Sequence, residues 1–243
     1  MKIAALSDIH GNLAALEAVL LDIRERGADL IVNLGDILSG PLQCAQTADR
    51  LMPLRLPTIS GNHERQLLTL EFDRMRVSDQ YAYSVLRPDH REWIATLPET
   101  LRLDDVLMVH GSPRGDLECL LETVTENGMR NATVAEIDER AGQTDAALIL
   151  CGHTHVPGAV RLSGERLVVN PGSVGLQAFE DDYPFPYKVE TGSPHARYAM
   201  LESSGGSWSA NLMAVGYDWD SAALLAETRG RRDWGRALRT GRV

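Results

Sequence analysis

The residues of this sequence best suited to chemistry are His153 and His155, which follow the apolar run 146–150. Successive side chains of an extended segment point to opposite sides, so residues two apart share one side. We therefore expect both imidazoles to face one point beyond the end of a strand. Neutral imidazoles that converge in this way suit a transition-metal ion. A lone His-x-His pair is also common on protein surfaces, so this pair by itself does not decide between the two interpretations.

Four further strand-like runs end in residues that can ligate a metal. Asp8 and His10 follow the run 2–6 with the same spacing of two. The other runs are followed by Asp36, by Asn62 with His63, and by His110. Five of the seven histidines of the chain lie in the five turns. Asp and Asn also favour turns for purely structural reasons, but this concentration at strand ends, where α/β sheets place their sites, favours one joint metal site.

The donor atoms of these turns indicate the metals and the reaction. Two divalent ions carry four positive charges, of which the Asp8 and Asp36 carboxylates neutralise only two, so positive charge remains for a phosphoryl group. Oxygen and nitrogen donors without thiolate favour Mn, Fe or Zn over Ca or a structural zinc site. A metal pair of this kind lowers the pKa of a bridging water, and the resulting hydroxide can attack phosphorus. The prediction is a two-metal hydrolysis of a phosphoester.

Strands and helices alternate along much of the chain, which predicts an α/β fold. We expect strands at 2–6, 29–34, 54–59, 101–103, 106–109, 146–150, 159–162, 166–169, 196–202 and 208–215. We expect helices at 13–26, 41–52, within 65–97 with Pro88 starting the last one, at 133–141 and at 219–227. No internal repeat or linker divides the chain. We therefore expect a single domain, 1–228, followed by an Arg-rich C-terminal tail, 229–243.

Composition restricts the classes of protein that the chain can belong to. The formal net charge of −10 argues against a broad nucleic-acid-binding surface, and we expect no stable nucleic-acid complex. No run approaches the roughly 20 apolar residues that span a bilayer, and the N-terminal apolar run is too short for a signal sequence. Three cysteines without paired spacing are typical of reduced thiols. We expect a cytoplasmic protein without a membrane partner.

The order and spacing of the motifs resemble the calcineurin-like metallophosphoesterase superfamily. The matching motifs are Asp8-x-His10, Gly35-Asp36, Gly61-Asn62-His63-Glu64, His110-Gly111 and Gly152-His153-Thr154-His155. The turn 170–175, Asn-Pro-Gly-Ser-Val-Gly, looks like that of the small bacterial and archaeal branch, the YfcE-like phosphodiesterases. The resemblance implies a four-layer α/β/β/α sandwich in a single domain, with a dinuclear metal centre at the sheet edges.

The resemblance also implies a role for each matching residue. One metal would be held by Asp8, His10, Asp36 and His155, and the other by Asp36, Asn62, His110 and His153, with Asp36 bridging. The ions would be Mn, or alternatively Fe, Zn or Ni. Asn62 and His63 would contact the substrate phosphate, and His63 would protonate the leaving oxygen. Alternatively, His63 is a residue at the N-terminus of a helix and has no catalytic role.

One departure from the family bears on the substrate. Phosphoprotein phosphatases of the superfamily carry Gly-Asp-x-x-Asp-Arg-Gly, whereas this sequence has Ser39 in place of the second carboxylate and lacks the adjoining Arg. The carboxylate would pair with His63, and the Arg would bind phosphate. We therefore expect a phosphodiesterase that acts on a small phosphoester or nucleotide, such as a dinucleoside polyphosphate. The alternatives are a phosphomonoesterase or phosphoprotein phosphatase, and a catalytically silent protein-binding scaffold of the same fold.

Two segments lie outside these motifs. We expect the segment 177–195 to be a surface loop, or alternatively a lid whose Phe179, Tyr183, Phe185 and Tyr187 stack on a substrate base. We expect the tail 229–243 to be solvated, or alternatively to steer polyanions or to contact another subunit in a homo-oligomer.

Overall fold

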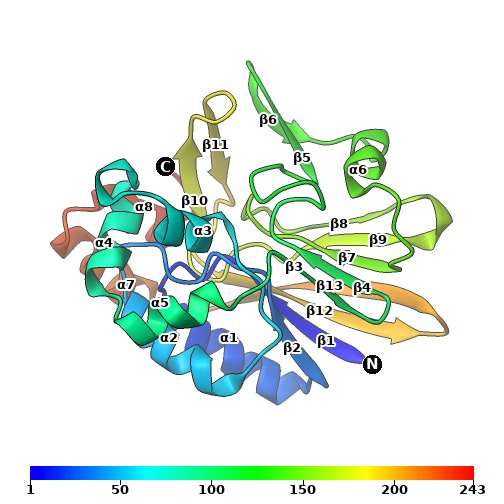
Figure 1. The fold of residues 1–243 in the computed structure, drawn as a ribbon, viewed down its shortest axis with the longest axis horizontal. Coiled ribbons are helices and arrows are strands. Elements are labelled where there is room, and N and C mark those ends of the chain that lie inside the picture. The colour runs from blue at the N-terminus through cyan, green and yellow to red at the C-terminus, as the bar shows by residue number, and fades with distance from the viewer.

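Two β-sheets packed face to face form the centre of the molecule (Figure 1). The computed structural model describes all 243 residues. The first sheet has the order β13-β12-β1-β2 and the second has the order β3-β4-β7-β9-β8. The strands of these sheets are β1 (Lys2–Leu6), β2 (Leu30–Asn33), β3 (Thr100–Leu103), β4 (Val106–Val109), β7 (Leu148–Leu150), β8 (Gly158–Arg161), β9 (Leu167–Asn170), β12 (Ala196–Ser204) and β13 (Ser207–Val215).

Helices cover the outer face of each sheet, and two hairpins rise above them. The helices are α1 (Leu13–Arg26), α2 (Cys44–Leu51), α3 (Asn62–Thr69), α4 (Val77–Val85), α5 (Pro88–Ala95), α6 (Val134–Ala141), α7 (Trp219–Thr228) and α8 (Arg232–Thr240). Short 3₁₀ helices are η1 (Met52–Leu54), η2 (Phe72–Arg74) and η3 (Ser163–Glu165). The hairpins are β5 (Glu122–Thr125) with β6 (Gly128–Asn131), and β10 (Ala178–Asp181) with β11 (Tyr187–Glu190). No helix is long and apolar enough to cross a membrane.

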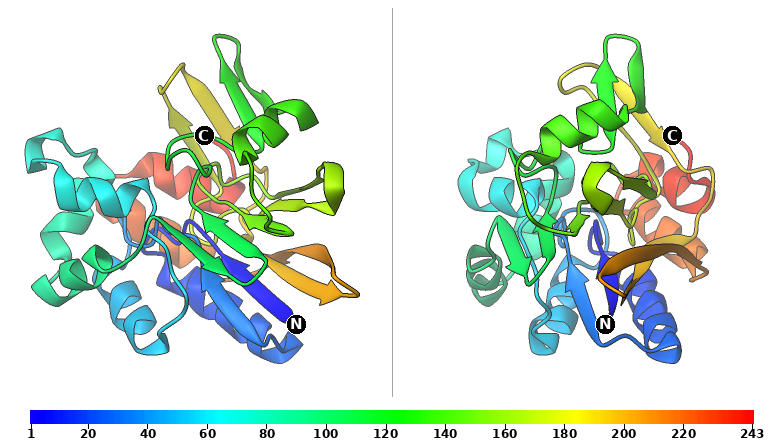
Figure 2. Two further views of the ribbon diagram at one scale, coloured as in Figure 1. Left: turned by 45° about the vertical axis from the view of Figure 1, so that its right-hand side comes forward. Right: turned by 90° about the vertical axis from the view of Figure 1, so that its right-hand side faces the viewer.

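Strand β1 shows how the layers are held together. Its side chains alternate, so that Ala4 and Leu6 pack with α1, while Ile3 and Ala5 face the second sheet. The strand is parallel to β2 and antiparallel to β12, so both of its edges are paired. Helix α6 covers the outer face of the second sheet with Ile137 and its neighbours. The predicted four-layer α/β/β/α architecture in a single domain is confirmed (Figures 1 and 2).

The parallel strands bring the turns that carry the predicted metal ligands to one edge of the sheets. Strand β4 is parallel to β7, which is parallel to β9, and β1 is parallel to β2. The carboxyl ends of parallel strands meet at the same edge of a sheet.

The predicted strand at 54–59 is wrong, since only Thr58 pairs with Asn33 in an isolated bridge. Pro57 has no N–H to donate to a ladder, and its carbonyl oxygen accepts a bond from the Asn33 N–H.

Two helix predictions also need correction. Helix α2 begins at Cys44 rather than at Pro41, because residues 40–43 form a turn in which the Gln43 N–H donates to the Gly11 carbonyl. The helical segment 65–97 is divided into α3, α4 and α5, with η2 between α3 and α4. Pro88 does start the last of these helices, as predicted.

The segment 177–195 contains a hairpin rather than an irregular loop. Strands β10 and β11 pair in antiparallel register, with Phe179 opposite Val189. Tyr187 is buried, whereas Tyr183 and Phe185 are exposed between the strands. The hairpin lies beside the β5–β6 hairpin above the sheets (Figures 1 and 2). An alternating pattern of only four residues per strand, separated by prolines, hid this hairpin in the sequence.

The segment 229–243 is not a solvated tail, contrary to the expectation for it. Residues 232–240 form α8, whose Trp234 and Leu238 are buried against α7 and the base of the β10–β11 hairpin. Arg239 pairs with Glu227 of α7. The amphipathic pattern of residues 232–240 is short and rich in arginine, and the arginines lie outside its apolar stripe. The sequence therefore did not predict this helix.

Candidate metal centre

The first cluster of metal-type ligands combines Asp8, His10 and His155. His10 Nε2 and His155 Nε2 lie 3.0 Å apart, and His155 Nε2 lies 3.4 Å from Asp8 Oδ1. The opposite ring atoms, Nδ1 of His10 and of His155, lie 2.8 Å from the carbonyl oxygens of Ser39 and Leu176. A carbonyl only accepts, so each Nδ1 carries the proton and each Nε2 presents a lone pair.

These donors fit a divalent cation. The two Nε2 lone pairs point toward each other, and two acceptors cannot form a hydrogen bond. Both carboxylate oxygens of Asp8 are buried and have no hydrogen-bond partner. Buried polar atoms without partners are costly, and a buried anion more so. A cation among Asp8, His10 and His155 would satisfy all of these atoms.

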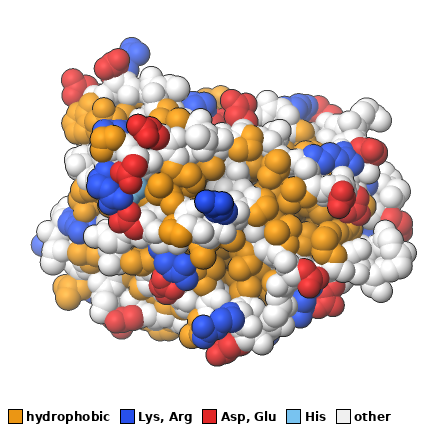
Figure 3. Space-filling view, turned by 60° about the horizontal axis from the view of Figure 1, so that its bottom comes forward, with side chains coloured by type: hydrophobic (Ala, Val, Ile, Leu, Met, Phe, Trp, Pro, Cys, Tyr) orange, Lys and Arg blue, Asp and Glu red, His pale blue; other side chains and the backbone are white.

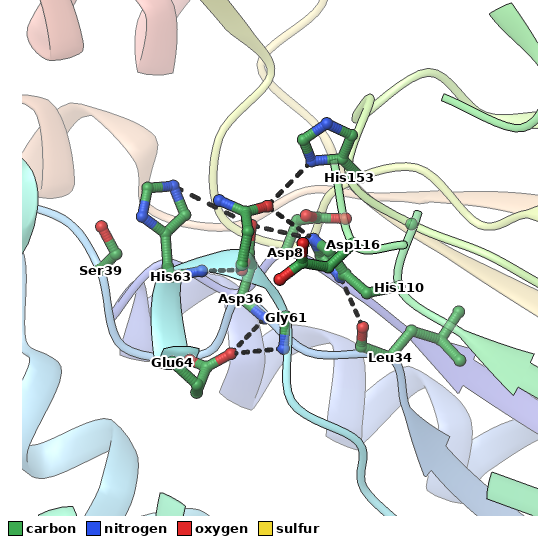
Figure 4. Close-up of polar contacts among 12 residues, drawn as sticks. Asp8, Leu34, Asp36, Ser39, Gly61, His63, Glu64, His110, Asp116 and His153 are labelled. Carbon is green, nitrogen blue, oxygen red and sulfur yellow. Dashed lines mark hydrogen bonds and ion pairs between the residues drawn. The ribbon is translucent and has the colours of Figure 1, made fainter. Parts of the chain in front are cut away.

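The second cluster combines Asp36, His110 and His153, with Asn62 between them. His110 Nε2 lies 3.1 Å from Asp36 Oδ2 and 3.2 Å from Asn62 Oδ1. His153 Nδ1 lies 3.0 Å from the same Asn62 oxygen. The Nδ1 atom of His110 lies 2.7 Å from the Leu34 carbonyl, which again leaves Nε2 directed at the cluster (Figure 4). The protein therefore has two candidate metal-binding His/Asp groups.

The backbone, rather than strand alternation, brings these side chains together. Five of the predicted ligands have positive φ angles, from 51° to 68°: Asp8, His10, Asp36, His153 and His155. This left-handed conformation costs non-glycine residues about 1–3 kcal/mol each and is concentrated at functional sites. The expectation that His153 and His155 face one point from an extended segment is wrong. The left-handed turns direct His155 to the first cluster and His153 to the second.

Glu64 holds the turns of the second cluster in place. Its side chain is fully buried, and its two oxygens accept bonds from the N–H groups of Asp36, Ile37 and Gly61 at 2.8–2.9 Å. Figure 4 shows this carboxylate beneath Asp36, on the side away from the histidines. The sequence motif contained Glu64, but only the structure reveals that it joins its own turn at Gly61 to the turn at Asp36 and Ile37, 27 to 28 residues away in the chain.

His63 lies between the clusters and a buried carboxylate of α4. Its backbone N–H donates to Asp36 Oδ1 at 2.9 Å, and its Nε2 lies 4.0 Å from Asp36 Oδ2. Its ring lies 5.4 Å from that of His10. Its Nδ1 lies 2.8 Å from Asp79 Oδ1. No motif pointed to Asp79, which stands 16 residues after His63 in a different helix.

Aromatic rings from two distant segments complete the walls of the first cluster. The Phe179 ring of β10 lies 4.6 Å from the ring of His155, and the Trp234 ring of α8 lies 6.0 Å from that of His10. The sequence predicted a surface loop for the first segment and a solvated tail for the second, so it did not predict these contacts with the histidines.

Burial and neighbouring charges set the pKa values of the imidazoles. Burial, followed by the proximity of His155, lowers the pKa of His10 to about 3. Burial also lowers the pKa of His153 to about 4. Burial opposes protonation of His110 and His63 too, but their neighbours together outweigh it. Asp36, Asp8 and the Leu34 carbonyl raise the pKa of His110 to about 10, and Asp36, Asp79 and Glu64 raise the pKa of His63 to about 9. A cation bound beside Asp36 would therefore displace a proton from His110.

The fold and the paired His/Asp clusters define a metallophosphoesterase. Residues 1–189 match the model of the calcineurin-like phosphoesterase superfamily domain, and the chain belongs to this superfamily. It is a metal-dependent phosphoesterase by family membership, and the family implies a phosphoester substrate.

The relatives include one with a stated activity. The chain is 29% identical over 186 residues to the phosphodiesterase YfcE of Escherichia coli, covering 72% of this chain and 80% of that protein. It is 27% identical over 198 residues to an uncharacterized Methanocaldococcus jannaschii protein, MJ0912, covering 71% of this chain and 76% of that one. A metallophosphoesterase crystal structure from Sphaerobacter thermophilus superposes with a TM-score of 0.76, 25% identity and 99% coverage of each chain.

Proposed function

We propose that this protein is a dimetal-dependent phosphodiesterase that hydrolyses a small phosphoester or nucleotide, such as a dinucleoside polyphosphate. The observation that carries the proposal is the pair of His/Asp clusters. In the first, the unpartnered oxygens of Asp8 and the lone pairs of His10 and His155 converge, and in the second Asp36, His110 and His153 do so. Two divalent ions would supply positive charge for the phosphoryl oxygens and would activate water as the nucleophile.

Each cluster holds one ion in this proposal. The first ion is held by Asp8, His10, His155 and Asp36, and the second by Asp36, Asn62, His110 and His153. Asp36 would be the ligand shared by the two ions, since its carboxylate belongs to the second cluster and its carbonyl accepts a bond from the His10 N–H of the first at 3.1 Å. The donor set suits Mn, with Fe, Zn or Ni as alternatives.

The residues that act on the substrate are Asn62 and His63. The Oδ1 atom of Asn62 faces His110 and His153, so its Nδ2 group can contact a phosphoryl oxygen. His63 Nε2 faces Asp36 and can donate its proton to the leaving oxygen. We also propose that residues 1–228 form the catalytic domain, with 229–243 closing its wall near His10.

The choice of a diester rests on the turn after Asp36 and on one relative. Ser39 stands where the phosphoprotein phosphatases of the superfamily have a carboxylate, and their phosphate-binding Arg is absent. The E. coli relative is named a phosphodiesterase. A monoester carries one more negative charge than a diester, so a site without that Arg favours the diester.

A substrate panel with Mn tests the proposal. Bis-4-nitrophenyl phosphate, cyclic nucleotides, a dinucleoside tetraphosphate and a phosphopeptide are compared at equal concentration, and bound metal is determined by elemental analysis. We expect two ions per chain and the highest kcat/KM on a diester or dinucleotide. A preference for the phosphopeptide would favour the phosphoprotein phosphatase. Metal-replete protein inert on every ester would favour the silent scaffold.

A homo-oligomer is the partner that we propose besides the substrate. Leu21, Leu212 and Leu224 are 46%, 41% and 57% exposed. Figure 3 shows hydrophobic side chains gathered over one face of the molecule, interrupted by single charged side chains. Contiguous apolar surface of this kind is typical of protein contacts. We expect light scattering to give a molar mass of at least twice 26.7 kDa, whereas 26.7 kDa would indicate a monomer.

A further inference from the structure

A catalytic histidine needs a partner that fixes its ring, and Ser39 cannot serve in this role. A hydroxyl carries no charge to stabilise an imidazolium, and the buried Ser39 Oγ has no hydrogen-bond partner at all. The Ser39 carbonyl is already engaged by His10 Nδ1 at 2.8 Å. Any carboxylate that orients His63 must therefore come from another part of the chain.

Asp79 of α4 lies in the position that this role requires. Its side chain is 0% exposed, and its Oδ1 lies 2.8 Å from His63 Nδ1. A carboxylate only accepts, so it holds the proton on Nδ1 and directs Nε2 away from itself. The Nε2 atom accordingly faces the metal clusters, 4.0 Å from Asp36 Oδ2.

A purely structural role does not account for this carboxylate. Asp79 lies in the first turn of α4, where an acidic side chain commonly bonds to the N–H groups of its own helix. Asp79 makes no such bond, and His63 is its one hydrogen-bond partner. Its second oxygen, Oδ2, is buried without any partner. Burying a carboxylate this way is costly, so helix stability does not account for its position, whereas the contact with His63 does.

We propose that Asp79 is the positioning residue of the leaving-group acid, replacing from α4 the carboxylate that Ser39 lacks. This inference rests on the proposed function of His63. When the ester P–O bond breaks, the leaving oxygen keeps the bonding electron pair and takes the proton from His63 Nε2. Water supplies the oxygen that joins phosphorus and a proton that later returns to His63, so the atoms and charges of the hydrolysis balance. Asp79 keeps Nε2 directed at the leaving oxygen throughout.

Asp79→Asn tests the proposal in the full-length, Mn-loaded protein. The substrates are two diesters, bis-4-nitrophenyl phosphate and diphenyl phosphate, because phenol is the poorer leaving group and depends more on an acid. We expect kcat to fall roughly 10- to 10²-fold for the phenyl ester and only a few-fold for the nitrophenyl ester. These losses are smaller than the roughly 10²- to 10⁴-fold of a lost acid, because Asp79 acts only through His63. KM and the Mn content should remain unchanged.

The double variant His63→Ala/Asp79→Asn shows whether Asp79 affects kcat by positioning His63 or independently of His63. If Asp79 acts through His63, removing it in the His63→Ala background changes kcat less than about twofold. Equal loss of kcat in both backgrounds would overturn the proposal. An unchanged kcat on the phenyl ester, or a loss of bound metal in Asp79→Asn, would overturn it as well.

The chain also contains a matched control. Asp49 Oδ1 of α2 lies 3.0 Å from Nε2 of the buried His90 of α5. This second Asp–His pair is not part of the metal clusters. Asp49→Asn weakens an Asp–His bond of similar length, together with the ion pair of Asp49 with Arg87. We expect kcat to stay within about twofold of the wild type. A similar loss of kcat in both variants would refute a specific role for Asp79.

An NMR measurement separates this proposal from the proposed function. In the zinc-supplemented full-length protein, ¹⁵N-edited spectra report the proton on His63 Nδ1, assigned by its absence in His63→Ala. We expect a hydrogen-bonded Nδ1 proton that shifts in Asp79→Asn and not in Asp49→Asn. Wild-type protein without phosphoesterase activity would refute the proposed function only, and the absence of this proton signal would overturn the role of Asp79.

Discussion

Gly61→Ala tests whether the second cluster depends on a close backbone approach. Gly61 has φ −96° and ψ −174°, which alanine adopts without strain. A Cβ atom there would lie 2.2 Å from Asp36 Oδ1 and 2.6 Å from Asp36 N, whereas ordinary contacts begin at 3.4 Å. The carboxylate would have to move by about 1 Å, since 3.4 − 2.2 = 1.2 Å.

The magnitude follows from what holds Asp36 in place. Its Oδ1 accepts the His63 N–H and its own N–H donates to Glu64. Overpacking costs about 1–3 kcal/mol, and losing one bond to a charged group costs about 1.5–3 kcal/mol. The reduced entropy of the unfolded chain offsets about 0.4–1 kcal/mol. We therefore expect Gly61→Ala to lower the free energy of unfolding by about 2–5 kcal/mol.

Urea unfolding, followed by circular dichroism, and elemental analysis of bound metal provide the assay. Gly115→Ala is the matched control, because a Cβ at Gly115 meets nothing within 4 Å and its φ is not positive. We expect the control to unfold like the wild type and to bind two ions, while Gly61→Ala binds fewer. A Gly61→Ala protein with the wild-type unfolding midpoint and both ions would refute the reasoning.

Further predictions concern the ligands, one buried acid and the C-terminal helix. His153→Ala and His155→Ala should each retain one ion but lose different ones; loss of both ions in either variant, by elemental analysis, would contradict the division of the pair. Burial raises the pKa of Glu122 from 4.5 to about 7, so its neutral form stabilises the fold below pH 4.5 and this stability is lost as pH rises through 7. Glu122→Gln, compared by urea unfolding of metal-free protein, should match the wild type near pH 4.5 and be more stable at pH 8 by up to about 3 kcal/mol, from (7 − 4.5) × 1.36. Trp234 is 6% exposed, and Trp234→Ala should cost about 3–5 kcal/mol of unfolding free energy, whereas the exposed Arg236→Ala on the same helix should cost little.

The strands and the ligand residues could be predicted because their signals are local. A buried parallel strand is a continuous apolar run, as in β1 and β7, and a polar turn follows it directly in the chain. Asp8, His10 and Asp36 were identified in this way. The argument from side-chain alternation was nevertheless wrong, since the left-handed backbone of these residues is stabilised only by the surrounding fold.

The segments that were misjudged have weak local signals and depend on distant contacts. The run 54–59 has a strand-like composition, but Pro57 limits it to one bridge. Strands β10 and β11 are short, and α8 is rich in arginine. Each is held by residues far away, as when Trp234 packs near His10. Local propensity does not contain this information.

The sequence by itself determined the α/β class, the superfamily and the set of metal-type ligands, because these follow from apolar runs and the polar turns beside them. Only the tertiary structure decided which ligands meet. His10 and His155 are 145 residues apart, and the 3.0 Å between their Nε2 atoms results from packing the two sheets together. The same holds for the pairing of His63 with Asp79, which depends on how α4 packs against α3. Sequence spacing specifies which side chains leave a strand end together, whereas sheet and helix packing specifies which atoms they face.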